Sequence, residues 1–232
     1  SGFATGALPT RLASAGALLL FGAGVTWLFE MNHTLSGRGF SEQISWSCFH
    51  SAMTRTAGFN VVDIGEMHPP TLLATIALMF IGGAPGSMAG GIKTVTFVVL
   101  IMTAWSALRR REEVQFWGRR ISPATSNIAS LLALLAGACL IVGVGLLMLC
   151  EDGHAAARTS QRWLALVFEA VSAFGTVGLS TGVTPLLTGQ GKLVIIVLMF
   201  LGRVGPLALS VYLARPANPL LVRRPKEDLA LG

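Results

Sequence analysis

A short apolar segment that ends in Thr-x-Gly occurs twice in this chain, and its repetition constrains the fold more than any other feature. Thr56 and Gly58 precede Thr176 and Gly178 by 120 positions each (176 − 56 and 178 − 58). In both copies the short segment lies between two longer apolar segments. The pattern predicts two tandem helix–pore-loop–helix repeats, in which a short helix enters the membrane and the chain then turns back.

The composition places such repeats in a lipid bilayer. Hydrophobic residues make up 53% of the 232 residues, charged residues only 12%, and the mean hydropathy is +0.67, so too few polar side chains are present to cover a soluble globule. The net charge of +6 comes from basic residues at helix ends, without the basic and aromatic motifs that read nucleic acid. The sequence therefore predicts an all-α integral membrane protein that binds no nucleic acid.

The apolar segments divide into long ones that can span a bilayer and short ones that cannot. At roughly 1.5 Å per residue a spanning helix needs about 20 residues, and segments of about 15 residues fit re-entrant helices. The linker between the repeats is the most basic loop and is expected in the cytoplasm, with both chain ends, while the pore loops enter from outside. The expected domains are 1–118 and 119–232; the expected long segments are 12–29, 128–150 and 191–214, and the short ones 40–54 and 163–174.

The second long helix of the first repeat is interrupted between residues 71 and 108. The interruption holds five glycines and a proline, and a regular helix there would cost several kcal/mol at roughly 1 per glycine and 3 per proline. Ile92 separates Gly91 from Lys93, so the stretch is not a phosphate-binding loop. Two interpretations stay open, a rigid bend that lines a vestibule and a movable gating loop; the residues are Gly82, Gly83, Ala84, Pro85, Gly86, Ser87, Met88, Ala89, Gly90 and Gly91.

The Thr-x-Gly segments are candidates for an ion-selectivity filter. Backbone carbonyls that point one way can replace the water around a dehydrated cation, and glycine permits the backbone twist that aims them. The C-terminus of the preceding short helix directs its negative dipole toward the ion. The alternative is an ordinary membrane turn, since Thr-x-Gly alone is a weak signal.

Arg203 is a charge near the middle of the last apolar span. A charged side chain that faced lipid would cost several kcal/mol, so we expect Arg203 to face a cavity or a partner. It follows Gly178 by 25 residues (203 − 178), which suits either a positive barrier in the pore below the filter or a structural tie to carbonyls or an acid.

The remaining polar residues do not indicate an enzyme. Cys48, Cys139 and Cys150 lie in apolar segments and are expected as packing thiols, and no Ser/His/Asp set or pair of membrane carboxylates is present. His50 and Glu169 occupy matching places in the two short helices and are expected to pack or hydrogen-bond there. The histidines lack metal-site spacing, and no metal beyond a permeant ion is expected; they are His33, His50, His68 and His154.

These motifs resemble the Trk/Ktr/HKT superfamily of potassium transporters, through residues 54–60, 82–94, 168–182 and 202–207. The resemblance implies four helix–pore-loop–helix repeats around one pore, K⁺ as permeant ion with Na⁺ as a second or coupled ion, and no organic cofactor. It maps the gating loop to residues 82–91 and the pore arginine to Arg203. The implied filter residues are Thr56, Ala57, Gly58 and Phe59 in one repeat and Thr176, Val177, Gly178 and Leu179 in the other.

The resemblance also implies an incomplete pore, because only the third and fourth repeats are present. Either a missing N-terminal half or a second chain must complete the filter. The family further implies a homodimer in the plasma (inner) membrane and a cytosolic nucleotide-binding regulatory ring. Two other functions remain open: an alternating-access cation symporter, which the broken helix would also suit, and a non-conducting assembly half.

Overall fold

The computed structural model describes residues 8–55, 57–83, 89–109, 115–116, 119–120, 122–152 and 162–213. The regular elements among these residues are helices, as expected, apart from two-residue strands β1 (Gln115–Phe116) and β2 (Arg119–Arg120), which form a small antiparallel ladder in the linker. The helices are α1 (Leu8–Glu30), α2 (Phe40–Met53), α3 (Pro69–Phe80), α4 (Thr94–Leu108), α5 (Pro123–Glu151), α6 (Arg162–Gly175) and α7 (Gly189–Leu213), with short 3₁₀ turns at Ile64–Glu66 and Thr184–Leu186.

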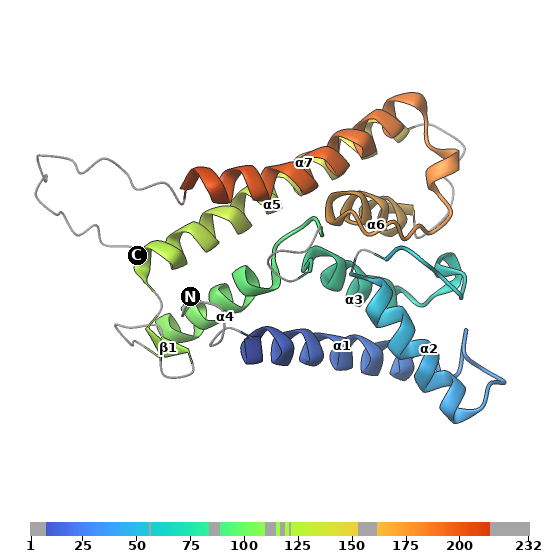
Figure 1. The fold of residues 1–232 in the computed structure, drawn as a ribbon. Helices are drawn as coiled ribbons and strands as arrows, with labels where there is room; N and C mark the ends of the chain where they lie inside the picture. Colours follow the sequence, from blue (N-terminus) through green and yellow to red (C-terminus); the bar gives the residue numbers. More distant parts are fainter. Residues whose placement is uncertain are drawn as a thin grey trace, which may run out of the picture.

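The helices form two groups that lie one above the other in Figure 1, α1 to α4 below and α5 to α7 above. In the lower group, the short helix α2 packs on α1, and a Cβ built on Gly22 would lie 2.7 Å from Leu78 of α3. In the upper group, a Cβ built on Gly143 of α5 would lie 2.6 Å from Leu198 of α7. The two glycines are 121 positions apart (143 − 22) and the two leucines 120 (198 − 78). A close contact between a glycine of the first long helix and a leucine of a later helix therefore recurs in both groups.

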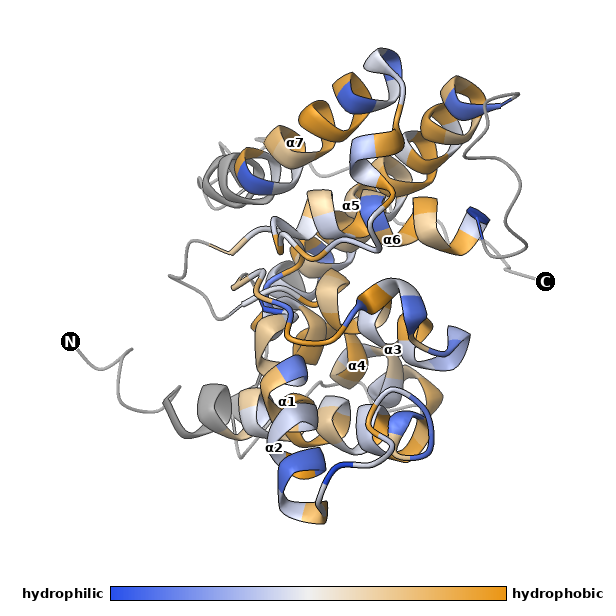
Figure 2. Ribbon diagram, turned by 90° about the vertical axis from the view of Figure 1, so that its right-hand side faces the viewer, coloured by the Kyte–Doolittle hydropathy of each residue, from blue (hydrophilic) through white to orange (hydrophobic). Residues whose placement is uncertain are grey.

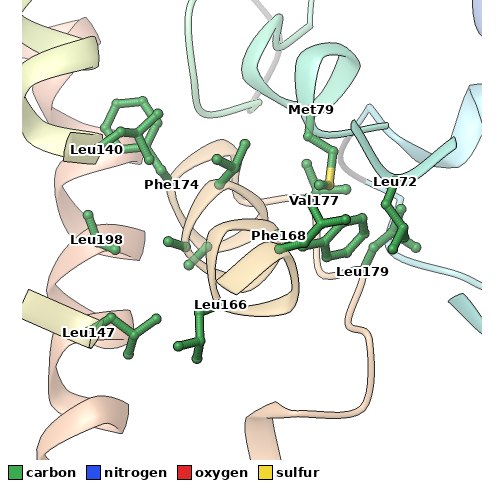
Figure 3. Close-up of a cluster of buried hydrophobic side chains, with 14 of the residues drawn as sticks. Leu72, Met79, Leu140, Leu147, Leu166, Phe168, Phe174, Val177, Leu179 and Leu198 are labelled. Atoms are coloured by element: carbon green, nitrogen blue, oxygen red, sulfur yellow. The ribbon is translucent and has the colours of Figure 1, made fainter. Parts of the chain in front are cut away.

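Helix α6 is the centre of the hydrophobic core. Its residues from Phe168 through Gly175 are all buried, with α5 and α7 on one side and α3 on the other. Figure 3 shows Phe168 beside Leu72 and Met79 of α3, and Leu140 of α5 near the end of α6. A helix whose C-terminal half is buried in this way holds the segment that follows it in a fixed place.

The outer surface of the long helices is apolar at positions that the protein does not cover. Leu134, Ile141 and Leu149 of α5 are 71%, 75% and 74% exposed. Hydrophobic colouring continues along α5 and α7, while hydrophilic residues gather at helix ends and turns (Figure 2). Among the described residues, two stretches are long and apolar enough to cross a membrane, Ala13–Glu30 and Thr125–Glu151. Exposed apolar helix faces of this kind are suited to lipid or to further membrane helices.

The ends of α1 and α5 lie against the starts of α3 and α7. Glu30 and Glu151 are the last helical residues, and both are fully buried. One carboxylate oxygen of Glu30 accepts the backbone N–H of His68 at 2.9 Å, and one of Glu151 accepts that of Thr188 at 2.8 Å. These amides directly precede α3 and α7, so each carboxylate satisfies a free donor at a helix N-terminus and stabilises its positive dipole end.

The interruption after α3 is bounded by backbone hydrogen bonds. Gly82 donates its N–H to the Ile92 carbonyl at 2.8 Å, and Ile92 donates to the Phe80 carbonyl at 3.2 Å, so that Ile81 and Ile92 form an isolated parallel bridge. Thr94, the first residue of α4, donates to the Gly83 carbonyl at 3.2 Å. These bonds hold the end of α3 and the start of α4 side by side at the base of the intervening loop.

Candidate functional site: two adjoining Thr-x-Gly segments

The two Thr-x-Gly segments lie against each other, although 120 residues separate them in the sequence. A Cβ built on Gly58 would be 2.7 Å from the Val177 carbonyl oxygen and 3.3 Å from the Gly178 Cα atom. A Cβ built on Gly178 would be 3.5 Å from the Gly58 Cα atom. The backbones of the two repeats therefore meet at their glycines, as two neighbouring walls of one narrow passage would.

The backbone in both segments turns in the left-handed direction. Gly58 has a φ of 68° and Gly178 a φ of 89°, and Thr176, at 52°, is the one non-glycine residue with positive φ among those described. Such a conformation disfavours L side chains, so Thr176 must be held there by its surroundings. The segment follows directly on the C-terminus of α6, whose carbonyl end carries a negative dipole that favours a cation.

Ser172 of α6 fixes the second segment at two points. The Val177 N–H donates to the Ser172 carbonyl at 2.9 Å, and the Ser172 hydroxyl donates to the Leu179 carbonyl at 2.6 Å. The side chains of Val177 and Leu179 are buried, with 3% and 2% of their surface exposed, while Gly178 between them is exposed. This alternation anchors two side chains in the core and leaves Gly178 at the lining of a cavity.

Glu169 of α6 anchors the chain just beyond the second segment. Its carboxylate accepts the Ser180 hydroxyl at 2.7 Å, the Thr181 N–H at 2.9 Å and the Thr184 hydroxyl at 2.5 Å. The expectation that Glu169 forms hydrogen bonds within its short helix describes this only in part, because its partners lie in the loop that follows. A buried carboxylate with several donors is a strong restraint on that loop.

The first repeat is built differently at the matching place. His50 of α2 makes a side-chain hydrogen bond of 3.1 Å with Thr75 of α3, not with the residues after Gly58. Phe59 is 69% exposed, whereas Leu179, its counterpart 120 residues later, is buried. Thr56 lies outside the described residues, and Ala57 is exposed. The first segment is thus less enclosed by this chain than the second.

Arg203 of α7 lines a cavity that also borders the second Thr-x-Gly segment. The cavity has a volume of about 480 Å³, and it is bounded by Thr176 and Gly178 of the second segment, by Glu169 and by the exposed side chain of Arg203. The structure therefore brings together the second predicted filter segment and the arginine singled out in the sequence. The guanidinium group of Arg203 and the carboxylate of Glu169 thus belong to residues that line the same cavity as the Thr-x-Gly backbone.

The C-terminal end of the glycine-rich loop reaches the second segment and α7. Gly90 donates its N–H to the Thr176 hydroxyl at 3.0 Å, and Gly91 donates to the Gly202 carbonyl at 3.3 Å. The Lys93 ammonium group bonds the Ala89 carbonyl at 2.8 Å. Residues 84–88, the middle of the predicted gating loop, lie outside the described residues.

The sequence interpretation missed several residues that shape the site. Taken one at a time, Ser172 and the buried carboxylates Glu30 and Glu151 match no sequence motif that would predict a role in the site. Repetition would have found the carboxylates, because Glu-x-x-His occurs in both repeats, 121 positions apart (151 − 30). His154 of the second copy is not among the described residues, while His33 of the first lies 3.4 Å from the Glu30 carboxylate.

Residues 17–218 match the family of TrkH cation transport proteins, and this chain belongs to that family. The resemblance found in the sequence is thereby confirmed, and the family is one of transporters, not of enzymes. The fold agrees: the TrkH potassium transporter from Vibrio parahaemolyticus superposes with a TM-score of 0.70 at 17% identity, over 89% of this chain and 44% of that structure.

Curated relatives carry potassium transport in their names. The chain is 37% identical to the Ktr system potassium uptake protein B of Vibrio alginolyticus, over 95% of this chain and 47% of the relative. It is 35% identical to the Ktr system potassium uptake protein D of Bacillus subtilis (94% and 46%), and 36% identical to the potassium/sodium uptake protein NtpJ of Enterococcus hirae (94% and 49%). The chain spans about half the length of these relatives.

Proposed function

We propose that this chain forms half of a potassium-conducting pore, with K⁺ passing along the backbone carbonyls of the two adjoining Thr-x-Gly segments. The observation that carries the proposal is the meeting of Gly58 and Gly178, from two repeats, with left-handed backbones beside a helix C-terminus. Names of relatives supply the ion, potassium in the Ktr proteins and potassium or sodium in NtpJ. The filter comprises residues 56–59 and 176–179.

The pore is completed by further repeats, from the same longer chain or from a second one. Two segments cannot surround an ion, and carbonyl rings in filters of this kind have fourfold symmetry. The 69% exposure of Phe59 supports an additional neighbour on the first segment. The relatives, about twice as long, are consistent with that arrangement. A homodimer of the complete protein and a cytosolic nucleotide-binding regulatory ring are the partners that the family resemblance implies.

The loop of residues 82–91 is the gate of this pore. Its C-terminal end contacts the second filter segment through Gly90 and Thr176, and its five glycines make several backbone states similar in energy. Deletion of residues 83–90 should raise basal K⁺ flux and weaken the response to the regulator. A loop that serves only as a rigid bend would instead collapse α3 and α4, and transport would be lost.

The membrane orientation follows from the basic linker, which we place in the cytoplasm of a plasma-membrane protein. The filter then opens outward, and Arg203 lies on its inner side as a positive barrier to the ion. Each repeat forms one domain, 1–118 and 119–232.

Uptake of ⁸⁶Rb⁺ and ²²Na⁺ by the complete protein in proteoliposomes tests the proposal. A pore should admit ⁸⁶Rb⁺ in response to membrane potential alone, without a fixed ratio to any second ion. An alternating-access symporter, which the broken helix would also allow, requires such a ratio. Comparison of this chain with and without the remaining repeats tests the third possibility, a half that assembles but does not conduct.

A further inference from the structure

The strained backbone of Thr176 coincides with a contact between the filter segment and the glycine-rich loop. Thr176 accepts the Gly90 N–H on its side-chain oxygen at 3.0 Å, across 86 residues of sequence. Gly90 and its neighbours Ala89 and Gly91 are all buried. A buried N–H without an acceptor is unfavourable, so the Thr176 hydroxyl has a structural task besides any contact with ions.

The surroundings of Gly90 form a socket that admits only a residue without a side chain. A Cβ built there would lie 2.9 Å from both the Phe174 carbonyl oxygen and the Thr176 hydroxyl oxygen. Gly91 has a φ of 70° and donates its N–H to the Gly202 carbonyl of α7. The C-terminal end of the loop is therefore seated between the end of α6 and the middle of α7, directly against the filter segment.

Among the described residues, the position that precedes the filter segment differs between the two repeats. Gly175, which precedes Thr176, corresponds to Arg55 in the first repeat (175 − 55 is 120). The Arg55 guanidinium group extends to the Ala15 carbonyl of α1 at 3.2 Å. At Gly175, by contrast, a Cβ would lie 3.6 Å from the nearest carbon of the Met79 carbonyl group and 2.8 Å from its oxygen. Of the two positions that precede the filter segments, Gly175 thus lies against the end of α3, whereas the Arg55 side chain extends to α1.

We propose that the Thr176 hydroxyl is a positioning group that latches the glycine-rich loop to the filter through the Gly90 amide. The hydroxyl oxygen accepts the Gly90 N–H of the loop, and backbone carbonyl oxygens bind the ion. When Gly90 leaves the socket, Thr176 loses the bond that accompanies its left-handed backbone, so the loop and the second filter segment change together. This inference rests on the proposed function of the loop as a gate and adds the residue that holds it closed.

The position of the loop can be measured without transport. Ala89, 5% exposed, is replaced by cysteine in the complete protein after Cys48, Cys139 and Cys150 are changed to serine, and its alkylation by a small maleimide is timed in membranes. Thr176→Val removes the acceptor but keeps the shape, and should speed alkylation about tenfold, the factor for one hydrogen bond near 1.4 kcal/mol. Thr176→Ser should restore the slow rate. Thr103→Val, on α4, is the matched control and should alter nothing.

A second variant approaches the latch from the loop. Gly90→Ala places a methyl group against two oxygens and should speed alkylation as Thr176→Val does, and the double variant should add little because both remove one contact. Unchanged alkylation in both single variants overturns the latch. So does a Thr176→Val protein whose ⁸⁶Rb⁺ over ²²Na⁺ preference falls while alkylation stays slow, since the hydroxyl would then serve the ion. If both variants speed alkylation but the protein conducts no K⁺, the latch would stand and the proposed function would be refuted.

Discussion

Gly58 and Gly178 share a left-handed backbone but differ in the space around them. A Cβ on Gly58 would meet the Val177 carbonyl oxygen at 2.7 Å, closer than real Cβ contacts allow, whereas one on Gly178 would meet no atom closer than 3.5 Å. A side chain therefore strains both positions through φ, at about 1 kcal/mol or more, but displaces the opposite segment at Gly58 alone. The two glycines are not equivalent parts of the site.

This difference predicts unequal losses of ion selectivity. Gly58→Ala should lower the preference for ⁸⁶Rb⁺ over ²²Na⁺ about tenfold, the factor for 1.4 kcal/mol, and Gly178→Ala should lower it less. Competitive uptake of the two ions is the measurement. Gly24→Ala in α1, where a Cβ meets nothing within 4 Å, is the control. Full selectivity in both filter variants would remove these glycines from the ion path.

Glu169 should matter through the loop it restrains. Glu169→Ala leaves the Ser180, Thr181 and Thr184 donors without their acceptor and should reduce the free energy of unfolding by about 1 to 3 kcal/mol, together with ion selectivity. Glu169→Gln keeps one acceptor oxygen, so its effect should be smaller. Thermal unfolding of the purified variants beside ⁸⁶Rb⁺/²²Na⁺ competition measures both. If the alanine variant matched the wild type in thermal unfolding and in ion selectivity, the loop would be stable without Glu169.

At the scale of helices, the sequence predicted the two short helices within two residues. The expected 40–54 is Phe40–Met53, and the expected 163–174 is Arg162–Gly175. Length, apolar content and a glycine at the end are local properties, and they suffice for these elements. The burial of the ends of α1 and α5 could not be predicted from local properties. Glu30 caps a helix that begins 39 residues later (69 − 30), and Glu151 caps one that begins 38 residues later (189 − 151).

Those carboxylates give a prediction about stability. Glu30→Ala and Glu151→Ala should each lower the free energy of unfolding by about 1 to 3 kcal/mol, since each variant loses the carboxylate that accepts the N–H just before α3 or α7. Thermal unfolding in detergent is the measurement. Glu42→Ala removes an exposed carboxylate of α2 that pairs with Arg38, and it should change stability by less than about 1 kcal/mol. A Glu30 variant as stable as Glu42→Ala would contradict the capping role.

At the scale of the whole molecule, the sequence predicted a helical fold and the transporter family, but not how the two helix groups meet. Nothing in the sequence pattern joins Gly90 to Thr176 or brings Gly58 against Val177, because such contacts depend on how the two helix groups pack. The packing also gives the repeats different roles. The first carries the glycine-rich loop, and the second provides the socket, the cavity beside the second Thr-x-Gly segment and Arg203.

Arg203 allows the proposed barrier to be measured. Arg203→Gln keeps a polar side chain and removes the charge, so K⁺ flux should rise about fivefold for a barrier of 1 kcal/mol, the repulsion of two unit charges about 4 Å apart in water. Initial rates of ⁸⁶Rb⁺ uptake give the flux, and thermal unfolding is recorded on the same protein. A variant that loses both flux and stability would identify Arg203 as a structural tie.

The location of the permeant ion tests the central claim most directly. Anomalous scattering from crystals of the complete protein grown in Rb⁺ should show a peak between the two Thr-x-Gly segments, within about 3 Å of the backbone carbonyl oxygens of Gly58 and Val177. The Leu179 carbonyl should be absent from the ligands, because the Ser172 hydroxyl already bonds it. A Rb⁺ peak that lies instead at the Glu169 carboxylate, or no peak between the segments, would contradict this account.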